Sequence, residues 1–332
     1  MRKLIIGIDG GGTKSHLAVF DQNGKCVAVG KHGPLNHEVM EYAFVQLEKE
    51  LSALIKDTLV SIDATPADVA FAVLGLAGMD TEKQHKIISA MVDRIGLSRY
   101  ILCNDAFLGV PAGCPGGIGI CAINGTGSTM AAVDHSGATV QVGGIGMYSN
   151  DCGGGSWFGT KLLGAVYGEL FKCEKKTIMT EMLLSRLGVN DSKDYVETIT
   201  TDMENDNINM CDLNLMFFDA VAKGDEVALD CLNESAGHYS GGIAHLANTL
   251  DFPDDRTLHI TFAGSVFVKE KTKTLPRLII NEVDKKIPSK NLEFHMLKTV
   301  PVAGAVYWAS KEAGFDIDIN VISEALAEAG LE

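Results

Sequence analysis

An aspartate followed by three glycines lies near the amino terminus of this 332-residue chain. The apolar run Leu4–Ile8 ends at Asp9, and the stretch Gly10–Lys14 follows it. Each ordered glycine costs roughly 0.5–1 kcal/mol relative to alanine, so three in a row indicate a backbone that must approach a ligand closely. A turn of exposed N–H groups beside a carboxylate suits a polyphosphate and its magnesium ion.

The spacing of this stretch differs from that of a P-loop. The P-loop has Gly-Lys-Ser/Thr five residues after its first glycine, whereas Lys14 comes one place late when the count starts at Gly7. A P-loop also opens a helix, but Ser15–Phe20 reads as a strand, Asn23-Gly24 as a two-residue hairpin turn and Lys25–Gly30 as a third strand. The sequence therefore predicts a β-meander with a phosphate-sized loop at its first bend.

The same unit occurs again 113 residues further along the chain. When Ile123–Gly143 is aligned with Gly10–Gly30, nine of the 21 positions are identical. The identical pairs are Gly12/Gly125, Thr13/Thr126, Ser15/Ser128, Ala18/Ala131, Asp21/Asp134, Gly24/Gly137, Val27/Val140, Val29/Val142 and Gly30/Gly143. Such a repeat indicates two related halves whose glycine loops can hold a phosphate chain between them. Only the first half brings an acid, because Ala122 stands where the first half has Asp9.

Three further polar residues stand where a ligand can bind. Asp105 follows the predicted strand Tyr100–Cys103, at the carboxyl end where open α/β sheets bind ligands. Asn36 stands where an amphipathic helix is expected to begin, and Asp151 lies in the glycine-rich stretch Gly144–Gly155. Each also has a purely structural interpretation, since Asn36 and Asp105 can cap helices and Asp151 can stabilise a turn.

Alternating strands and helices position these residues. Val69–Leu76 is a continuous apolar run, typical of a strand buried on both faces, and a helix is predicted over Thr81–Ile95. This alternation predicts parallel strands added to the first meander. The breaker-rich segment Pro111–Gly117 predicts a domain boundary.

The second half is predicted to contain more helix. Residues 157–222 are expected to be mainly helical, and the apolar spacing predicts a long buried helix over Leu232–Leu250. Further predictions are strands over Leu258–Ala263 and Leu292–Leu297 and helices over Ala303–Lys311 and Ile319–Leu331.

The composition limits the classes of partner. The formal net charge of −15 argues against nucleic acid or an anionic membrane as a partner, and requires local neutralisation of any bound nucleotide. No apolar run approaches the ~18 residues of a membrane span, and the apolar run near the amino terminus is too short for a signal peptide. The eight scattered cysteines do not suggest a disulfide framework, so we expect a cytoplasmic protein with reduced thiols.

The two glycine loops resemble a known pair of phosphate motifs. Asp9–Thr13 and Asn124–Ser128 are similar to those of the actin, heat-shock-chaperone and sugar-kinase superfamily. Within it the chain resembles the N-acetylglucosamine kinase family, in the group of benzoyl-CoA reductase activator-type ATPases, from Lys3 to about Ala309. Further matching motifs are Asn36-His37, Gly75-Leu76-Ala77-Gly78, Asn104-Asp105-Ala106, Gly143-Gly144, Asp151, Ala263-Gly264-Ser265-Val266 and Ala303-Gly304-Ala305.

The resemblance implies an α/β fold of two related ribonuclease-H-like (actin-like ATPase) domains, each a mixed sheet with a β-meander flanked by helices. It implies ATP and Mg²⁺ as cofactors, with Asp9 at the metal and Asp105 as the catalytic base. The implied nucleotide-binding residues are Gly10, Gly11, Gly12, Thr13, Lys14, Gly125, Thr126, Gly127, Gly264 and Ser265. The implied sugar-binding residues are Asn36, Asp105, Ser128, Thr129, Gly144, Ile145, Gly146 and Asp151. Relatives usually continue this last aspartate with Glu/Gln-Gly-Ser, whereas this chain has Cys152-Gly153-Gly154.

We therefore expect an ATP-dependent hexosamine kinase that phosphorylates the 6-hydroxyl of N-acetylglucosamine, while glucosamine and N-acetylmuramic acid remain alternative substrates. Residues 1–115 and 116–332 are the expected domains, with the last helix a candidate to pack back on the first, and we expect a homodimer. An ATPase that activates a redox partner is a second hypothesis, although no cysteine pair has the spacing of an iron–sulfur ligand pair. A nucleotide-switched interaction or chaperone module is a third, although the chain leaves no room for a peptide-binding domain.

Overall fold

Two five-stranded sheets of the same topology form the frame of the protein, whose computed structural model describes residues 3–331. The first sheet has the order β3-β2-β1-β4-β5 and the second the order β8-β7-β6-β9-β10. The strands of the first sheet are β1 (Leu4–Gly10), β2 (Ser15–Asp21), β3 (Cys26–His32), β4 (Val69–Leu76) and β5 (Tyr100–Cys103). Those of the second are β6 (Gly119–Asn124), β7 (Ser128–Val133), β8 (Thr139–Gly143), β9 (Thr257–Ala263) and β10 (Asn291–Met296).

Strand directions also agree between the two sheets. In each sheet the three meander strands pair antiparallel and the two later strands pair parallel. The predicted mixed sheets with meanders are therefore confirmed, and the sequence repeat corresponds to a structural one.

The meander turns differ from the predicted two-residue hairpin. The Asp21 N–H donates to the carbonyl of Lys25 at 3.0 Å, and the Asp134 N–H donates to the carbonyl of Ala138 at 3.0 Å. Three residues therefore lie between each bonded pair. The third of them is glycine with φ of +84° or +82°, as a three-residue loop that ends in the left-handed region requires. This turn explains two of the repeated pairs, Asp21/Asp134 and Gly24/Gly137.

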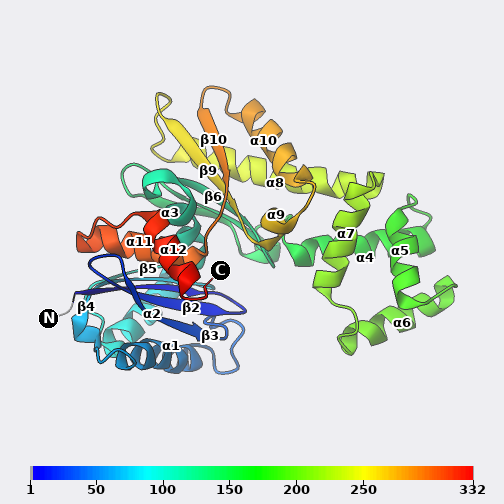
Figure 1. Cartoon of the computed structure of the whole chain (residues 1–332). Helices are drawn as coiled ribbons and strands as arrows, with labels where there is room; N and C mark the ends of the chain where they lie inside the picture. The colour runs from blue at the N-terminus through cyan, green and yellow to red at the C-terminus, as the bar shows by residue number, and fades with distance from the viewer. Residues whose placement is uncertain (1–2, 332) are drawn as a thin grey trace.

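Helices cover both faces of the first sheet (Figure 1). On one face α1 (Ala43–Val60) and α2 (Glu82–Ile95) pack against Leu4, Ile6 and Ile8 of β1. On the other face α11 (Pro301–Ala313) and α12 (Ile319–Glu328) pack against Ile5. The alternation along β1 is the period-two pattern of a strand buried on both faces.

The second sheet packs one face on a large helical core. Its main neighbours are α8 (Glu226–Thr249) and α10 (Thr274–Lys286), while α4 (Gly155–Lys172) and α7 (Met210–Ala222) extend the same core outward. With α5 (Ile178–Leu187) and α6 (Ser192–Glu204) they form a helical extension that projects from the second half in Figure 1. The remaining helical segments are α3 (Gly109–Gly113), α9 (Ser265–Lys269) and the 3₁₀ turns η1 (Pro66–Asp68), η2 (Asp105–Leu108), η3 (Pro115–Gly117) and η4 (Gly146–Tyr148).

The chain crosses between the halves at α3 and returns through α11. A Cβ on Gly304 of α11 would lie 2.1 Å from the carbonyl oxygen of Leu108, so only glycine allows this helix to contact the chain leading into α3. A Cβ on Gly7 would likewise lie 2.6 Å from the Val306 nitrogen. Through these two glycines α11 packs closely against β1 on one side and against the chain leading into α3 on the other.

The helix expected from about Asn36 begins instead at Ala43. Residues 37–42 form turns, and Val39, which the periodic pattern placed on the buried side, is 60% exposed. The apolar spacing continued past the true start of the helix, so that prediction was wrong.

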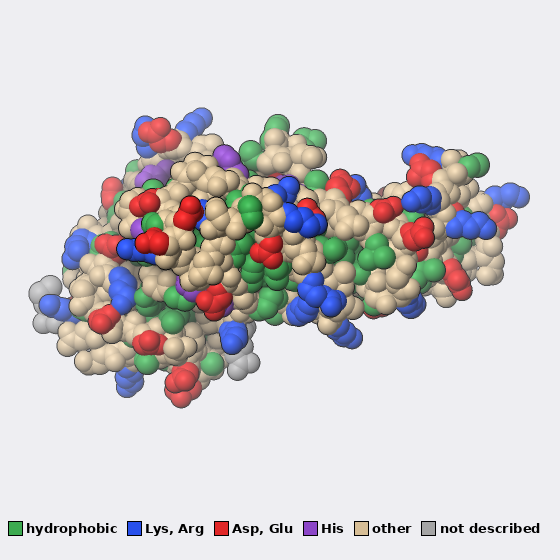
Figure 2. Space-filling model, turned by 90° about the horizontal axis from the view of Figure 1, so that it is seen from above, with side chains coloured by type: hydrophobic (Ala, Val, Ile, Leu, Met, Phe, Trp, Pro, Cys, Tyr) green, Lys and Arg blue, Asp and Glu red, His purple; other side chains and the backbone are tan. Residues whose placement is uncertain are grey.

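The surface is mixed in charge. Figure 2 shows acidic and basic side chains interspersed over the viewed face. Within residues 3–331, no helix is both long enough and apolar enough to span a membrane.

Candidate functional site

The first glycine loop joins β1 to β2. The Gly11 N–H donates to the carbonyl of Lys14 at 3.2 Å and closes the turn, while Gly12, Thr13 and Lys14 are exposed. A Cβ on Gly11 would lie 2.9 Å from that same carbonyl oxygen, so glycine is needed for the tight turn. The loop thus presents backbone and one ammonium group to a ligand.

The second glycine loop joins β6 to β7 and lies against the start of α4. The Gly125 N–H donates to the carbonyl of Gly127 at 2.9 Å, and the Gly155 N–H donates to the carbonyl of Gly125 at 2.8 Å. Thr126 and Gly127 are exposed. A helix amino terminus beside exposed backbone is a favourable place for an anion.

Packing behind this loop explains why glycine stands at position 154, where relatives usually have serine. Gly154 has φ of +86°, and a Cβ there would lie 2.4 Å from the carbonyl oxygen of Thr126. A Cβ on Gly153 would lie 2.7 Å from the hydroxyl of Tyr239. Both glycines allow the chain to pass close to the second loop before α4 begins.

Asp9 and Asp105 leave the same edge of the first sheet. Asp9 pairs in register with Gly75 of β4, which pairs with Cys103 of β5, two residues before Asp105. Burial raises the pKa of Asp9 to about 7; the charge of Asp105 adds to the increase and the charge of Lys14 opposes it. The strand register therefore brings two carboxylates together beside the first glycine loop.

The pKa of Asp105 is raised to about 6, chiefly by burial and further by the charge of Asp80, while the Ala106 backbone N–H lowers it. Like charges disfavour one another's ionised form, and a bound cation relieves this repulsion. Carboxylate oxygens are also the ligands that Mg²⁺ prefers. The donor set at this edge fits a hard divalent cation.

The cap of η2 is Asn104 and not Asp105. The Oδ1 of Asn104 accepts the N–H of Ala106 at 2.9 Å, and its Nδ2 donates to Oδ1 of Asp80 at 3.0 Å. Of the two interpretations of Asp105, the structure contradicts the helix cap.

Asn36 lies next to the first glycine loop. Its Oδ1 accepts the N–H of Glu38 at 2.9 Å, so it closes a turn and does not cap α1. A Cβ on Gly78 would lie 2.4 Å from that oxygen, and one on Gly12 would lie 3.9 Å from the Nδ2. The side chain therefore sits between the first loop and the segment that follows β4.

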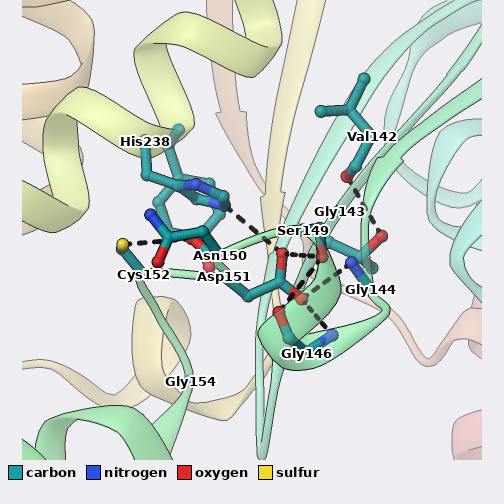
Figure 3. A network of polar contacts seen from close by, with 12 residues as sticks. Val142, Gly143, Gly144, Gly146, Ser149, Asn150, Asp151, Cys152, Gly154 and His238 are labelled. Atoms are coloured by element: carbon teal, nitrogen blue, oxygen red, sulfur yellow. Dashed lines mark hydrogen bonds and ion pairs between the residues drawn. The ribbon is translucent and has the colours of Figure 1, made fainter.

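A loop from the second half is organised by Asp151 (Figure 3). Its Oδ2 accepts the N–H groups of Gly144 at 3.0 Å and Gly146 at 2.9 Å, and its Oδ1 accepts the hydroxyl of Ser149 at 2.7 Å. Ile145, between the two glycines, is 47% exposed. The structural role of Asp151 is thus present, and it gathers the predicted sugar-binding residues of this loop in one place.

Two more predicted sugar-binding residues lie on β7. The Ser128 hydroxyl is buried beside the phenol of Tyr239. The Thr129 hydroxyl donates to the carbonyl of Val142 at 3.4 Å. A Cβ on Gly143 would lie 2.8 Å from Oδ1 of Asp151, so β7, β8 and the Asp151 loop are close together.

Sequence reasoning missed His238, which reaches the same loop from α8. Its Nε2 lies 3.9 Å from Oδ1 of Asp151 (Figure 3), with the two side chains 15% and 9% exposed. Burial lowers the pKa of His238, and the charge of Asp151 opposes this shift. No pattern along the chain marks His238, because the apolar spacing of α8 predicts only a buried helix.

Sequence reasoning also missed a contact between the two halves. Nε2 of Gln141 on β8 donates to Oδ1 of Asp80 at 3.1 Å and to the carbonyl of Gly143 at 3.2 Å. The same Asp80 oxygen accepts from Asn104. The Asp151 loop of the second half therefore faces the Asp105 edge of the first.

A cavity of about 490 Å³ lies beside Ser265, between α7 and α9. Its lining includes Asn214, Leu215, Phe218, Val266 and Lys269. Gly264 has φ of +92°, and a Cβ there would lie 2.4 Å from the carbonyl oxygen of Asn124, just before the second loop. The volume is in the range of small-molecule sites, and the position fits the base and ribose of a nucleotide. A larger cavity, of about 900 Å³, contains none of the predicted site residues.

The chain is similar to kinases of amino sugars and to an ATPase family. The BadF/BadG/BcrA/BcrD ATPase family matches residues 6–309. An N-acetylmuramic acid/N-acetylglucosamine kinase from Clostridium acetobutylicum is 27% identical over 269 residues, which cover 80% of this chain and 85% of that protein. An N-acetyl-D-glucosamine kinase from Dictyostelium discoideum is 23% identical over 299 residues, covering 88% and 93%.

Solved structures agree on the fold. A protein from Chromobacterium violaceum, provisionally named an N-acetylglucosamine kinase, superposes with a TM-score of 0.64 at 18% identity, over 91% of this chain and 97% of that chain. The two mixed five-stranded sheets with flanking helices are those of the two-domain actin-like ATPase fold, as predicted.

Proposed function

Because the chain belongs to the BadF/BadG/BcrA/BcrD ATPase family, we propose that it is an ATP-dependent hexosamine kinase. The observation that carries the proposal is the arrangement of the acids. Asp9 and Asp105 share one edge beside the first glycine loop, and the Asp151 loop faces that edge through the Gln141–Asp80 contact. Similarity to amino-sugar kinases over most of the chain supports the same function.

The substrate in this proposal is N-acetylglucosamine, with its 6-hydroxyl as the acceptor. The two relatives are named for N-acetylglucosamine, one of them also for N-acetylmuramic acid. N-acetylmuramic acid and glucosamine are therefore the alternative substrates. The sugar would lie among Asn36, Asp105, Ser128, Thr129, Gly144, Ile145, Gly146 and Asp151.

ATP would lie across both glycine loops, with its phosphates along Gly10–Lys14 and Gly125–Gly127 and its adenosine at Gly264 and Ser265. The exposed backbone of both loops and the start of α4 suit the phosphates, and the 490 Å³ cavity suits the base. Asp9 would hold Mg²⁺, which when bound supplies positive charge that neutralises phosphate oxygens.

Asp105 would act as the general base. Its carboxylate accepts the proton of the 6-hydroxyl while the hydroxyl oxygen bonds to the γ-phosphorus and the bond to the ADP oxygen breaks. A pKa of about 6 leaves Asp105 mostly ionised at neutral pH and close enough to the working pH to transfer the proton efficiently. Lys14 and the loop N–H groups balance the charge of the phosphates.

We further propose domains of residues 1–115 and 116–332 and a homodimer in the cytoplasm. The division is supported by η3, which lies between the two sheets in sequence, although α11 and α12 pack on the first sheet. Sugar and nucleotide contacts come from both halves, so we expect the halves to close on their ligands and exclude water.

A coupled assay of ADP release with a panel of sugars tests the function. We expect Mg²⁺-dependent turnover with N-acetylglucosamine and negligible turnover without sugar. The 6-deoxy analogue, which lacks the acceptor, should bind but give no turnover. Rapid hydrolysis of ATP without any sugar, or stimulation by an iron–sulfur protein, would instead assign the chain to activators of redox enzymes.

A further inference from the structure

Two histidines and a glutamate meet on the outer part of the second sheet. His259 lies on β9, and Glu293 and His295 lie on β10, the edge strand that runs beside β9 in Figure 1. His259 pairs in register with Glu293, and residues two apart on a strand share a face, so all three side chains project to the same side. Within residues 3–331 these three form a group whose ligand atoms all lie within 4.8 Å of one another.

The distances between the ligand atoms fit a single small cation. Nδ1 of His259 and Nε2 of His295 are 3.0 Å apart. Oxygens of Glu293 lie 3.5 Å from the first nitrogen and 3.7 Å from the second. Tetrahedral zinc with bonds of about 2.0–2.2 Å places its ligand atoms about 3.3–3.6 Å apart. Small movements of three partly exposed side chains would produce that geometry.

Without a cation the same arrangement leaves one interaction unfavourable. A pair of neutral imidazoles shares one N–H between the two facing nitrogens, so the other nitrogen presents a lone pair. That lone pair accepts the shared N–H, but it also faces the carboxylate of Glu293. A cation at the centre gives all three lone pairs a favourable partner.

The two histidines are partly buried, and the glutamate is exposed. The side chains of His259 and His295 are 20% and 28% exposed, whereas Glu293 is 57% exposed. The neutral imidazole ring is the form of histidine that binds metal. Water can reach the exposed side as a fourth ligand.

We propose that His259, Glu293 and His295 form a site for one borderline divalent cation such as Zn²⁺. Imidazole nitrogens favour this class, whereas Mg²⁺ prefers the oxygen ligands found at Asp9. Gly264 lies five residues after His259, which is about 16–17 Å at ~3.3 Å per strand residue. The site is therefore separate from the nucleotide site and does not depend on the proposed sugar kinase activity.

The position of the site indicates what the cation does. It joins the edge strand β10 to β9, and the chain continues from β10 into α11, which packs on the first sheet. A cation at this point clamps the segment that leads from the second half back to the first. Its effect is on stability, with no part in phosphoryl transfer.

Zinc titration of the full chain after chelator treatment tests the site. We expect one zinc ion per chain by calorimetry and, at a free zinc concentration of 100 times Kd, a rise in Tm of at least about 4 °C. His295→Gln should weaken binding about hundredfold or more and abolish the Tm rise at the same zinc concentration. His245→Gln, which alters an exposed histidine on α8, is the matched control and should behave as the wild type.

Folding of the variant is checked by its Tm in chelator, which should equal that of the wild type. Glu293→Gln changes the most exposed ligand and gives a second test if His295→Gln is unstable. Zinc binding that survives both substitutions, or that is lost on alkylation of the exposed thiols Cys173 and Cys211, would overturn the proposal. A Tm that rises at low pH and not with zinc would show that the group binds a proton, and would also overturn it.

Discussion

Replacing Asp105 with asparagine tests the assignment of the base most directly. Asparagine keeps the size of the side chain and can still hydrogen-bond, but it cannot accept a proton at neutral pH. The start of η2 should remain intact, because Asn104 provides its cap with a 2.9 Å hydrogen bond to the N–H of Ala106. The substitution therefore removes the proton acceptor and leaves the local fold.

The expected loss follows from the role of the group. A positioned general base contributes about 10²–10⁴ in rate, which corresponds to about 2.7–5.4 kcal/mol of activation free energy. We expect kcat of Asp105→Asn to fall at least about a hundredfold. Affinity for Mg²⁺-ATP should hold, because loss of the Asp105 charge lowers the pKa of Asp9 and favours its ionised form.

A pH profile separates the loss of a base from a general disturbance. With the pKa of Asp105 at about 6, its ionised fraction falls from about 0.9 at pH 7 to about 0.1 at pH 5. At saturating Mg²⁺-ATP, where the bound cation keeps Asp9 ionised, the wild-type kcat should therefore drop about tenfold over this interval as Asp105 is protonated, and the residual kcat of Asp105→Asn should lack this step.

Steady-state assays with the sugar that supports turnover, from pH 5 to 9, give both quantities. Asp57→Asn, the same change on the exposed side of α1, is the matched control and should retain wild-type kinetics. The base role would be refuted by an Asp105→Asn enzyme that keeps more than about a tenth of kcat, or whose profile still shows the step near pH 6.

Three further predictions address the cation, the second loop and the contact between the halves. Asp9→Asn should raise the KM for Mg²⁺-ATP while leaving sugar affinity, measured by calorimetry, nearly unchanged; an equal loss of sugar binding would make Asp9 structural. Gly154→Ala should destabilise the protein by more than about 1 kcal/mol and raise the KM for ATP, because a Cβ is strained at φ of +86° and displaces the second loop. Gly164→Ala, on the exposed side of α4 where a Cβ meets no atom within 4 Å, should instead stabilise the protein by about 0.5–1 kcal/mol in thermal unfolding. If both alanine variants were destabilised, or both stabilised, the argument from the close contact at Gly154 would be contradicted. Gln141→Glu places a like charge against Asp80 and should raise the KM for sugar about tenfold, more than Gln141→Ala does; equal values for the two would show that the contact has no role in closure.

Much of the fold could be predicted because its signals are local. The glycine loops, the strands on either side of them and the repeat offset of 113 residues are all patterns within short stretches. The two sheets of equal topology follow from that repeat once the later parallel strands are added. Local pattern was misleading where the helical spacing of apolar residues extended beyond the helix itself. Val39 keeps that spacing but lies in exposed turns before α1.

The candidate site could be predicted only where its residues lie at strand ends or in glycine loops. Asp9 and Asp105 belong to this class, since strand order brings their strand ends together. The contact of Gln141 with Asp80 joins residues 61 apart in sequence, and no pattern along the chain encodes it. His238 was likewise hidden, because the apolar spacing of α8 predicts a core helix and gives no role to one polar residue within it.

The acid pair also links the stability of the fold to its ligand. The pKa of folded Asp9, about 7, lies above its unfolded value of 3.8, so the folded state binds more protons between these values. Stability is therefore lost as pH rises from about 4 towards 7, and above 7 the unliganded protein carries the full cost of an ionised, buried carboxylate. Asp9→Asn removes this cost and should stabilise the ligand-free protein by roughly 1–3 kcal/mol at pH 8. A group that destabilises the empty protein in this way is better explained by a cation it binds than by a structural role, because a bound cation offsets the burial of the charge and the repulsion from Asp105 that raise the pKa of Asp9.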